Sequence, residues 1–190
     1  MREQESQAEE ILKKAALREA AGDVSGAIAL CERAVQCAGG EPRPHYVRGS
    51  LLLRQGRLDE AGEALRRAVE LKPDYAEAHV NLGIALFQAG RLQEAALSFR
   101  EGVRHGPRLP NAHLALGNAL FALGDAAGAA SSYEEAARLE PAYAKAVEYA
   151  ADAYLALGGK DMARRHLTRL RDLDAAAAEA LEGRIERTPG

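Results

Sequence analysis

Three equally spaced histidines are the first candidates for chemistry in this 190-residue sequence. His45, His79 and His113 lie 34 residues apart, and imidazole nitrogens are common zinc ligands. Ligands of one zinc ion lie about 2.0–2.1 Å from it, whereas neighbouring packed helices lie about 8–10 Å apart. We therefore expect no metal site and no cofactor. The three rings are better explained as parts of packed seams, each with one hydrogen-bonded nitrogen.

A second candidate is Gly158-Gly159-Lys160, which has the composition of the end of a phosphate-binding loop. Tyr154 stands where such a loop needs its first glycine, and Asp161 stands where it needs Ser or Thr. We therefore interpret the segment as a turn. Elsewhere no nucleophile, base and orienting group can be grouped by their spacing, so the sequence predicts a protein that is not an enzyme.

The charge pattern argues against nucleic acid as a partner. The formal net charge is −3, with 25 Lys and Arg against 28 Asp and Glu. The arginine-rich stretch from 164 to 171 is offset by Asp161, Asp172 and Asp174, and is better explained by a solvated helix face than by a site for an acidic partner. Without a basic excess to neutralise phosphates, we expect no nucleic-acid partner.

The hydropathy pattern predicts no insertion into a membrane. No stretch approaches the roughly 20 consecutive apolar residues that a spanning helix requires. The first ten residues hold four glutamates and lack the apolar core of a secretory signal, so we expect a cytoplasmic location. Cys31 and Cys37 lie six residues apart on one expected helix, about 9 Å along its axis, and are too far apart to form a disulfide.

The elements that position all these residues follow a period of 34. Small residues at positions 15, 49, 83, 117 and 151 alternate with large ones at 31, 65, 99, 133 and 167, as interdigitating helices require. Each unit has two helical patterns separated by one recurring glycine: Gly22, Gly56, Gly90, Gly124 and Gly158. The pattern predicts five helical hairpins at 8–41, 42–75, 76–109, 110–143 and 144–177. An N-terminal extension (1–7) precedes them, and a capping helix and tail (178–190) follow.

These columns resemble the tetratricopeptide repeat over residues 8–177. The match is strongest from 42 to 143, where Asn81-Leu82-Gly83 is followed by Gly90, Ala95, Phe99 and Pro107. The resemblance implies an all-α fold, a right-handed α-solenoid of five 34-residue helix-turn-helix repeats with a C-terminal capping helix. It also implies a non-enzymatic protein-protein interaction scaffold, whose first helices line a concave groove for a peptide or a partner helix.

The first helices carry an apolar stripe beyond the one needed for packing. In the third unit Leu82 and Leu86 form the packing stripe, while Val80, Ile84 and Phe87 form another. Asparagine and glutamine amides lie between, and they can donate to and accept from a peptide backbone. The predicted peptide-binding groove comprises Tyr46, Ser50, Leu53, Val80, Asn81, Ile84, Phe87, Gln88, Asn111, Leu114, Asn118, Phe121, Tyr149 and Asp152. An alternative is that Val80, Ile84 and Leu114 only seal one repeat to the next.

Some tetratricopeptide domains clamp the C-terminal carboxylate of heat-shock chaperones with Lys, Arg and Asn side chains. When those five positions are aligned on the glycine columns, at most one of five matches in any frame, so we expect no chaperone carboxylate clamp. The partner is then another protein or peptide ligand. A second possibility is a self-assembling structural adaptor, a homo-oligomer formed through the same face or an uncapped end. A domain that regulates an enzyme in trans has the same sequence signature.

Overall fold

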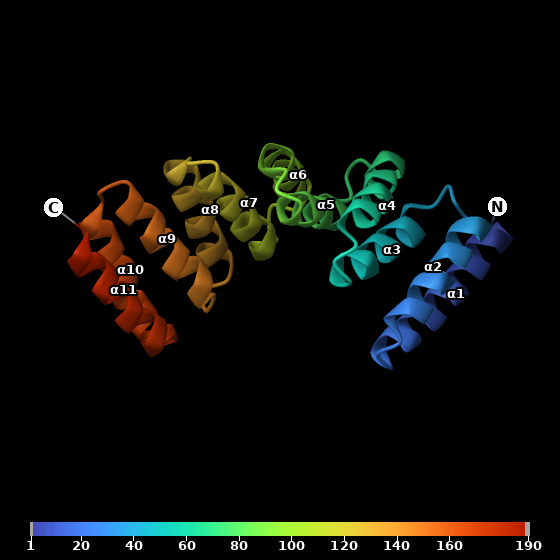
Figure 1. The fold of residues 1–190 in the computed structure, drawn as a ribbon, viewed down its shortest axis with the longest axis horizontal. Helices are drawn as coiled ribbons and strands as arrows, with labels where there is room; N and C mark the ends of the chain where they lie inside the picture. The colour runs from blue at the N-terminus through green and yellow to red at the C-terminus, as the bar shows by residue number, and fades with distance from the viewer. Residues whose placement is uncertain (1, 189–190) are drawn as a thin grey trace. The chain divides into compact units, whose positions relative to one another are not determined.

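The computed structural model describes residues 2–188, and every regular element in this range is an α-helix (Figure 1). The chain divides into two compact units, Met1–His105 and Gly106–Gly190. Between residues 2 and 188 no helix combines the length and apolar character needed to cross a membrane. The all-α fold predicted from the sequence is confirmed.

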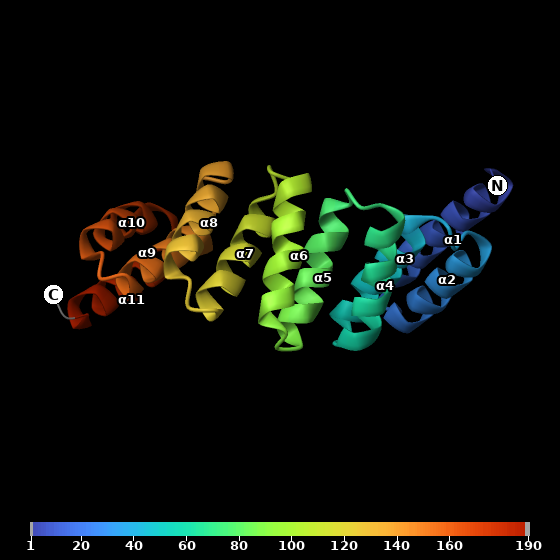
Figure 2. The ribbon, with the colours of Figure 1, turned by 90° about the horizontal axis from the view of Figure 1, so that it is seen from above.

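The first unit consists of three helical hairpins packed one after another. The second helix of one hairpin also contacts the first helix of the next, and the first helices α3 and α5 contact each other. Figure 2 shows α5 and α6 lying side by side along their length. The helices are α1 (Arg2–Ala20), α2 (Val24–Cys37), α3 (Pro42–Arg54), α4 (Leu58–Leu71), α5 (Ala76–Gln88) and α6 (Leu92–His105).

The second unit consists of two hairpins and a final helix that covers the second of them. The final helix packs on both α9 and α10, and its Leu181 and Ile185 join a core that includes Val147, Leu167 and Leu170. The helices are α7 (Pro110–Ala122), α8 (Ala126–Leu139), α9 (Ala144–Ala156), α10 (Lys160–Leu173) and α11 (Ala175–Arg187).

The turn inside every hairpin depends on the recurring glycine. Gly22, Gly56, Gly90, Gly124 and Gly158 all have φ between 73° and 85°, and no other described residue has a positive φ. Side chains with a Cβ rarely adopt this left-handed conformation, so the glycine column fixes where each first helix ends. The 34-residue spacing of this column therefore sets the register of the hairpins.

The two helices of a hairpin are in close contact where the small column meets the large one. A Cβ added to Gly83 would lie 2.5 Å from Phe99 Cε1, and one added to Gly117 would lie 2.5 Å from Tyr133 Cε1. The outer hairpins have alanine in this column, and the facing residues there are Cys31 and Leu167, which lack a ring. The predicted alternation of small and large residues is thus observed as direct contact.

The three equally spaced histidines hold the loops between hairpins. The Nε2 atom of each ring lies within hydrogen-bond distance of the carbonyl oxygen six residues earlier: His45 with Gly39 (3.1 Å), His79 with Pro73 (2.8 Å), His113 with Pro107 (3.0 Å). The prediction that one nitrogen of each ring is hydrogen-bonded is confirmed. Within residues 2–188 no group of three or more His, Cys, Asp or Glu side chains is arranged to hold a metal ion.

In the last hairpin an arginine takes over the role of the histidine. Val147 stands at the histidine position, and Arg169 of α10 donates through Nη2 to the carbonyl oxygen of Pro141, at 2.8 Å. The same nitrogen donates to the carbonyl oxygen of Ala137, also at 2.8 Å, near the end of α8. The equivalent carbonyl is therefore held in each of the four loops between hairpins. A histidine holds it in the first three loops, and an arginine holds it in the fourth.

Both ends of the predicted repeat array differ in their boundaries from the sequence-based division. Residues 2–7, expected as an extension, form the first turns of α1. The capping helix begins at Ala175 rather than 178, because the Asp174 carboxylate accepts a hydrogen bond from the Ala177 N–H at 3.0 Å and caps the helix there.

Candidate peptide-binding surfaces

In the first unit the predicted groove residues of α3 and α5 form one polar contact between the helices. Asn81 donates through Nδ2 to Ser50 Oγ at 2.8 Å, and Ser50 donates in turn to the carbonyl oxygen of Tyr46 at 2.9 Å. This chain fixes the amide orientation and leaves the Asn81 carbonyl oxygen able to accept a hydrogen bond from a ligand.

The apolar groove residues of this unit divide into two groups. Leu53, Ile84 and Phe87 are half-buried, and Gln88 beside them is exposed, so all four reach the surface. Val80 does not, because only 3% of it is exposed. Its Cγ2 fills the space above Gly102 of α6, where an added Cβ would lie 2.7 Å away. The assignment of Val80 to the groove is therefore wrong, and Val80 belongs to the core of its own hairpin.

A tyrosine pair beside this surface was not predicted. The rings of Tyr46 and Tyr75 lie 4.8 Å apart between centroids, tilted by 36°, and Lys72 Nζ lies 4.9 Å from the centroid of Tyr75. Burial raises the pKa of Tyr75 to about 12, so the phenol stays neutral and can donate or accept. Tyr75 and Tyr143 precede the first helix of their hairpins at equivalent positions. This recurrence was the feature of the sequence that could have drawn attention to Tyr75.

In the second unit the groove residues of α7 are accessible to different degrees. Asn111 is exposed and Phe121 is 41% exposed, whereas Leu114 packs partly on the core of the following hairpin. The sealing role considered for Leu114 accounts for this contact. Asn118 Oδ1 accepts a hydrogen bond from the Tyr133 hydroxyl at 2.9 Å, which leaves its NH₂ group able to donate.

On α9, Tyr149 is half-buried and lies edge-on to Tyr133, with ring centroids 5.6 Å apart. Asp152 was predicted to line the groove, but the capping helix engages it. Arg184 Nε donates to Asp152 Oδ1 at 2.8 Å, and Arg184 Nη2 donates to Glu148 Oε1 at 2.9 Å. Burial raises the pKa of Asp152, although Arg184 opposes the shift. Asp152 therefore joins α9 to α11, and its carboxylate is already paired where it reaches the surface.

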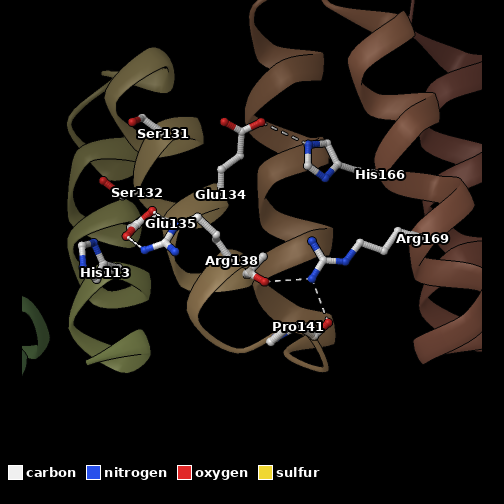
Figure 3. Close-up of a pocket in the computed structure, with 10 residues that line it drawn as sticks. His113, Ser131, Ser132, Glu134, Glu135, Arg138, Pro141, His166 and Arg169 are labelled. Carbon is white, nitrogen blue, oxygen red and sulfur yellow. Dashed lines mark hydrogen bonds and ion pairs between the residues drawn. The ribbon is translucent and has the colours of Figure 1, made fainter. Parts of the chain in front are cut away.

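A depression that was not predicted lies on the second helices of this unit. It has a volume of about 780 Å³ and is lined from α7, α8, α10 and the loop at Pro141 (Figure 3). Glu134 accepts a hydrogen bond from the Tyr154 hydroxyl at 2.9 Å and lies 3.6 Å from His166 Nε2. The rings of Tyr154 and His166 stack at 5.7 Å.

The charged groups of this depression have partners within the same unit. Glu135 accepts two hydrogen bonds from Arg138, at 2.6 and 2.7 Å, and Arg169 holds the loop carbonyls, as Figure 3 shows. Burial lowers the pKa of His166, although the nearby Glu134 opposes the shift. Each charged group is thus held by a hydrogen bond or a close contact within the depression, which is best described as a polar seam between hairpins.

Comparison with known proteins agrees with this geometry. Sequence models of the tetratricopeptide repeat match residues 46–112 and residues 110–143, which together span just over half of the chain. The chain belongs to the tetratricopeptide repeat (TPR) family. No curated protein matches its sequence at a significant level.

Several solved structures share the TPR fold with this chain. MamA is 22% identical, with a TM-score of 0.80 over 87% of this chain and 96% of MamA. YrrB, described as a TPR protein with an unusual peptide-binding site, is 18% identical, with a TM-score of 0.77 over 91% and 90%. TTC0263, a thermophilic TPR protein of Thermus thermophilus, is 22% identical, with a TM-score of 0.66 over 95% and 98%. At these identities the likeness concerns the fold: an α-solenoid of helical hairpins.

Proposed function

We propose that this TPR protein is a non-enzymatic scaffold that binds an extended peptide or a partner helix on the first helices of its hairpins. The observation that supports this most strongly is the surface of α3 and α5 in the first unit. There the fixed amide of Asn81 lies among side chains that reach the surface without being needed to close the core: Leu53, Ile84, Phe87 and Gln88.

The chemistry of this surface suits a polypeptide. Half-buried apolar side chains can contact alternate side chains of a ligand, while an oriented amide can satisfy its backbone. The corresponding surface of the second unit offers the opposite group, because Asn118 keeps its donors rather than its acceptor. The peptide-binding site of YrrB, on the same fold, supports the same use of this architecture. As part of this proposal, we expect that the protein has no chaperone carboxylate clamp and no nucleic-acid partner.

A phage-displayed library of random peptides, selected against the full chain, tests the proposal. Peptides recovered from it are measured by fluorescence anisotropy against the parent chain and three variants. We expect Phe87→Ser to weaken binding at least about tenfold, and Asn81→Ala to weaken it about fivefold, the effect of one hydrogen bond of about 1 kcal/mol. Leu97→Ser, on the outer surface of α6 and 60% exposed in the parent, is the matched control and should change nothing.

Thermal melts of the same variants separate binding from folding. Phe87 is only half-buried, so Phe87→Ser should cost much less than the roughly 3–5 kcal/mol typical of a fully buried phenylalanine. Peptides that bind the Phe87→Ser and Asn81→Ala variants as tightly as the parent would contradict the assignment of the site to α3 and α5.

A further inference from the structure

Glu77, at the start of α5, presents a carboxylate without a cation. It is exposed, and none of the ion pairs among residues 2–188 includes it. The same column of the repeat is paired in the first two hairpins, where Arg43 Nη1 of α3 lies 2.7 and 2.6 Å from the two carboxylate oxygens of Glu9 on α1. Arg43 is thus already engaged, and the next member of the column, Glu77, is left unpaired.

Two tyrosine rings lie beside this carboxylate. Tyr75, two residues before Glu77, tilts against Tyr46 with ring centroids 4.8 Å apart. Both side chains are half-buried, so part of each reaches the surface. Burial is the main cause of the raised pKa of Tyr75, and Glu77 adds to the rise more than Arg43 opposes it. The field of these two charged side chains at the phenol is therefore negative.

The ring of Tyr75 already attracts a cation. Lys72 Nζ, from the end of α4, lies 4.9 Å from the ring centroid, within the range of about 6 Å over which a cation interacts with a π system. Lys72 is exposed, and such contacts are weak at exposed sites. Lys72 thus shows what kind of group this ring binds, and it can give way to a cation that also pairs with Glu77.

We propose that the corner formed by Tyr46, Tyr75 and Glu77 binds a basic side chain of the peptide ligand, with arginine preferred over lysine. The inference rests on the proposed function, because Glu77 lies one helical turn before Asn81 on the same side of α5. A guanidinium is planar, so it can lie on an aromatic ring while two of its N–H groups donate to one carboxylate. An ammonium lacks this double geometry.

An acidic ligand side chain is the main competitor for this corner, since Lys72 and Arg43 both lie near Tyr75. The contacts favour the basic side chain. A cation meets the unpaired carboxylate of Glu77. An anion would have to displace Glu9 from Arg43, and it would then lie near Glu77, whose like charge disfavours it.

The peptides recovered by phage display against the full chain test this inference. Among those that Phe87→Ser weakens, we expect an arginine or lysine at one shared position, and replacing it by alanine should weaken binding about tenfold. Glu77→Gln should weaken binding about fivefold. Tyr75→Leu, which removes the ring, should weaken it about threefold, whereas Tyr75→Phe keeps the ring and should bind nearly as the parent does. Glu63→Gln, at an exposed carboxylate on α4, is the matched control.

Reversing the charge on both sides identifies the contact. A peptide in which the shared basic residue is replaced by glutamate should bind the Glu77→Arg variant more tightly than the parent. Circular dichroism checks that every variant is folded. Phe87-dependent peptides that share no basic residue, or that bind Glu77→Gln as tightly as the parent, overturn the inference and leave the proposed function standing. A shared acidic residue, with binding weakened by Lys72→Ala, overturns it as well. If Phe87→Ser weakens none of the recovered peptides, both proposals fail.

Discussion

The two units share one hairpin design but join their hairpins in different ways. Inside a hairpin both rely on the same contact, a glycine against an aromatic ring, at Gly83 and Phe99 and at Gly117 and Tyr133. Between hairpins, the second unit adds half-buried polar contacts: Glu134 with Tyr154 and His166, and Arg184 with two carboxylates. The period therefore constrains the packing within a hairpin, while the seam between hairpins is free to differ and to respond to pH.

The largest effect is expected where the two units are alike. Gly83→Leu or Gly117→Leu places a side chain where even a Cβ would lie 2.5 Å from a ring, so each should lower the free energy of unfolding by about 1–3 kcal/mol or more. Denaturant titration measures the change. Gln93→Leu, on the exposed side of α6, is the control. A Gly117→Leu variant as stable as Gln93→Leu would show that the helices do not approach at this column.

The next largest effect is a loss of stability that we expect in the second unit and not in the first. Arg184→Ala leaves Asp152 and Glu148 half-buried without their cation, and we expect a loss of about 1–2 kcal/mol, since hydrogen bonds to charged groups are worth more than neutral ones. Hydrogen exchange should show the loss in amides of α9 and α11, with the amides of α3 and α5 unaffected. Arg187→Ala, an exposed position on the same helix, should have little effect.

A smaller effect concerns pH. Burial lowers the pKa of His166, so the folded second unit binds fewer protons than the unfolded chain as pH falls through the ordinary histidine value of 6.5. Its stability should therefore decrease on acidification in that range, and His166→Phe should reduce the decrease. Glu134, which faces the ring and opposes the shift, limits the size of the effect, and Arg169 on the same helix adds to it.

His45 provides the comparison in the first unit. Burial also lowers its pKa, opposed by its bond to the Gly39 carbonyl, so acidification should weaken both units. Denaturant titrations of His166→Phe and of His45→Phe at pH 7 and pH 5.5 distinguish the two contributions. A stability that is independent of pH between these values in the parent chain would contradict the assignment of either ring as buried and neutral.

The smallest effect is a difference in thiol reactivity. Burial raises the pKa of Cys31 to about 11, so the thiol is protonated at neutral pH and reacts only when the first unit opens. Alkylation followed by mass spectrometry should modify the half-buried Cys37 first. Gly83→Leu, within the same unit, should accelerate modification of Cys31 more than Gly117→Leu does, and equal acceleration would show that the units do not open separately.

The sequence predicted the features that repeat. The glycine turns, the small and large columns and the hydrogen-bonded histidines all recur at 34 residues, and each is found in the structure. The contacts that could not be predicted are those in which a groove residue meets something outside that pattern. Val80 is buried because Gly102 leaves room for it. These two residues belong to different columns of the repeat, and neither column alone indicates the contact. Asp152 is engaged by Arg184, which belongs to a helix outside the repeats. Glu134 and His166 face each other in one seam only, so no column could reveal them.

The exchange of a histidine for Arg169 limits how freely these repeats can be rearranged. In three hairpins the side chain that holds the loop carbonyl comes from the first helix directly after the loop, so loop and clamp lie within seven residues of each other. In the last hairpin the clamp comes from α10, 28 residues beyond Pro141. A duplication or deletion that cuts the chain between α9 and α10 would separate the loop from its clamp. The clamp of the final loop therefore depends on α9 and α10 staying together, whereas the earlier clamps do not depend on the second helix of their hairpin.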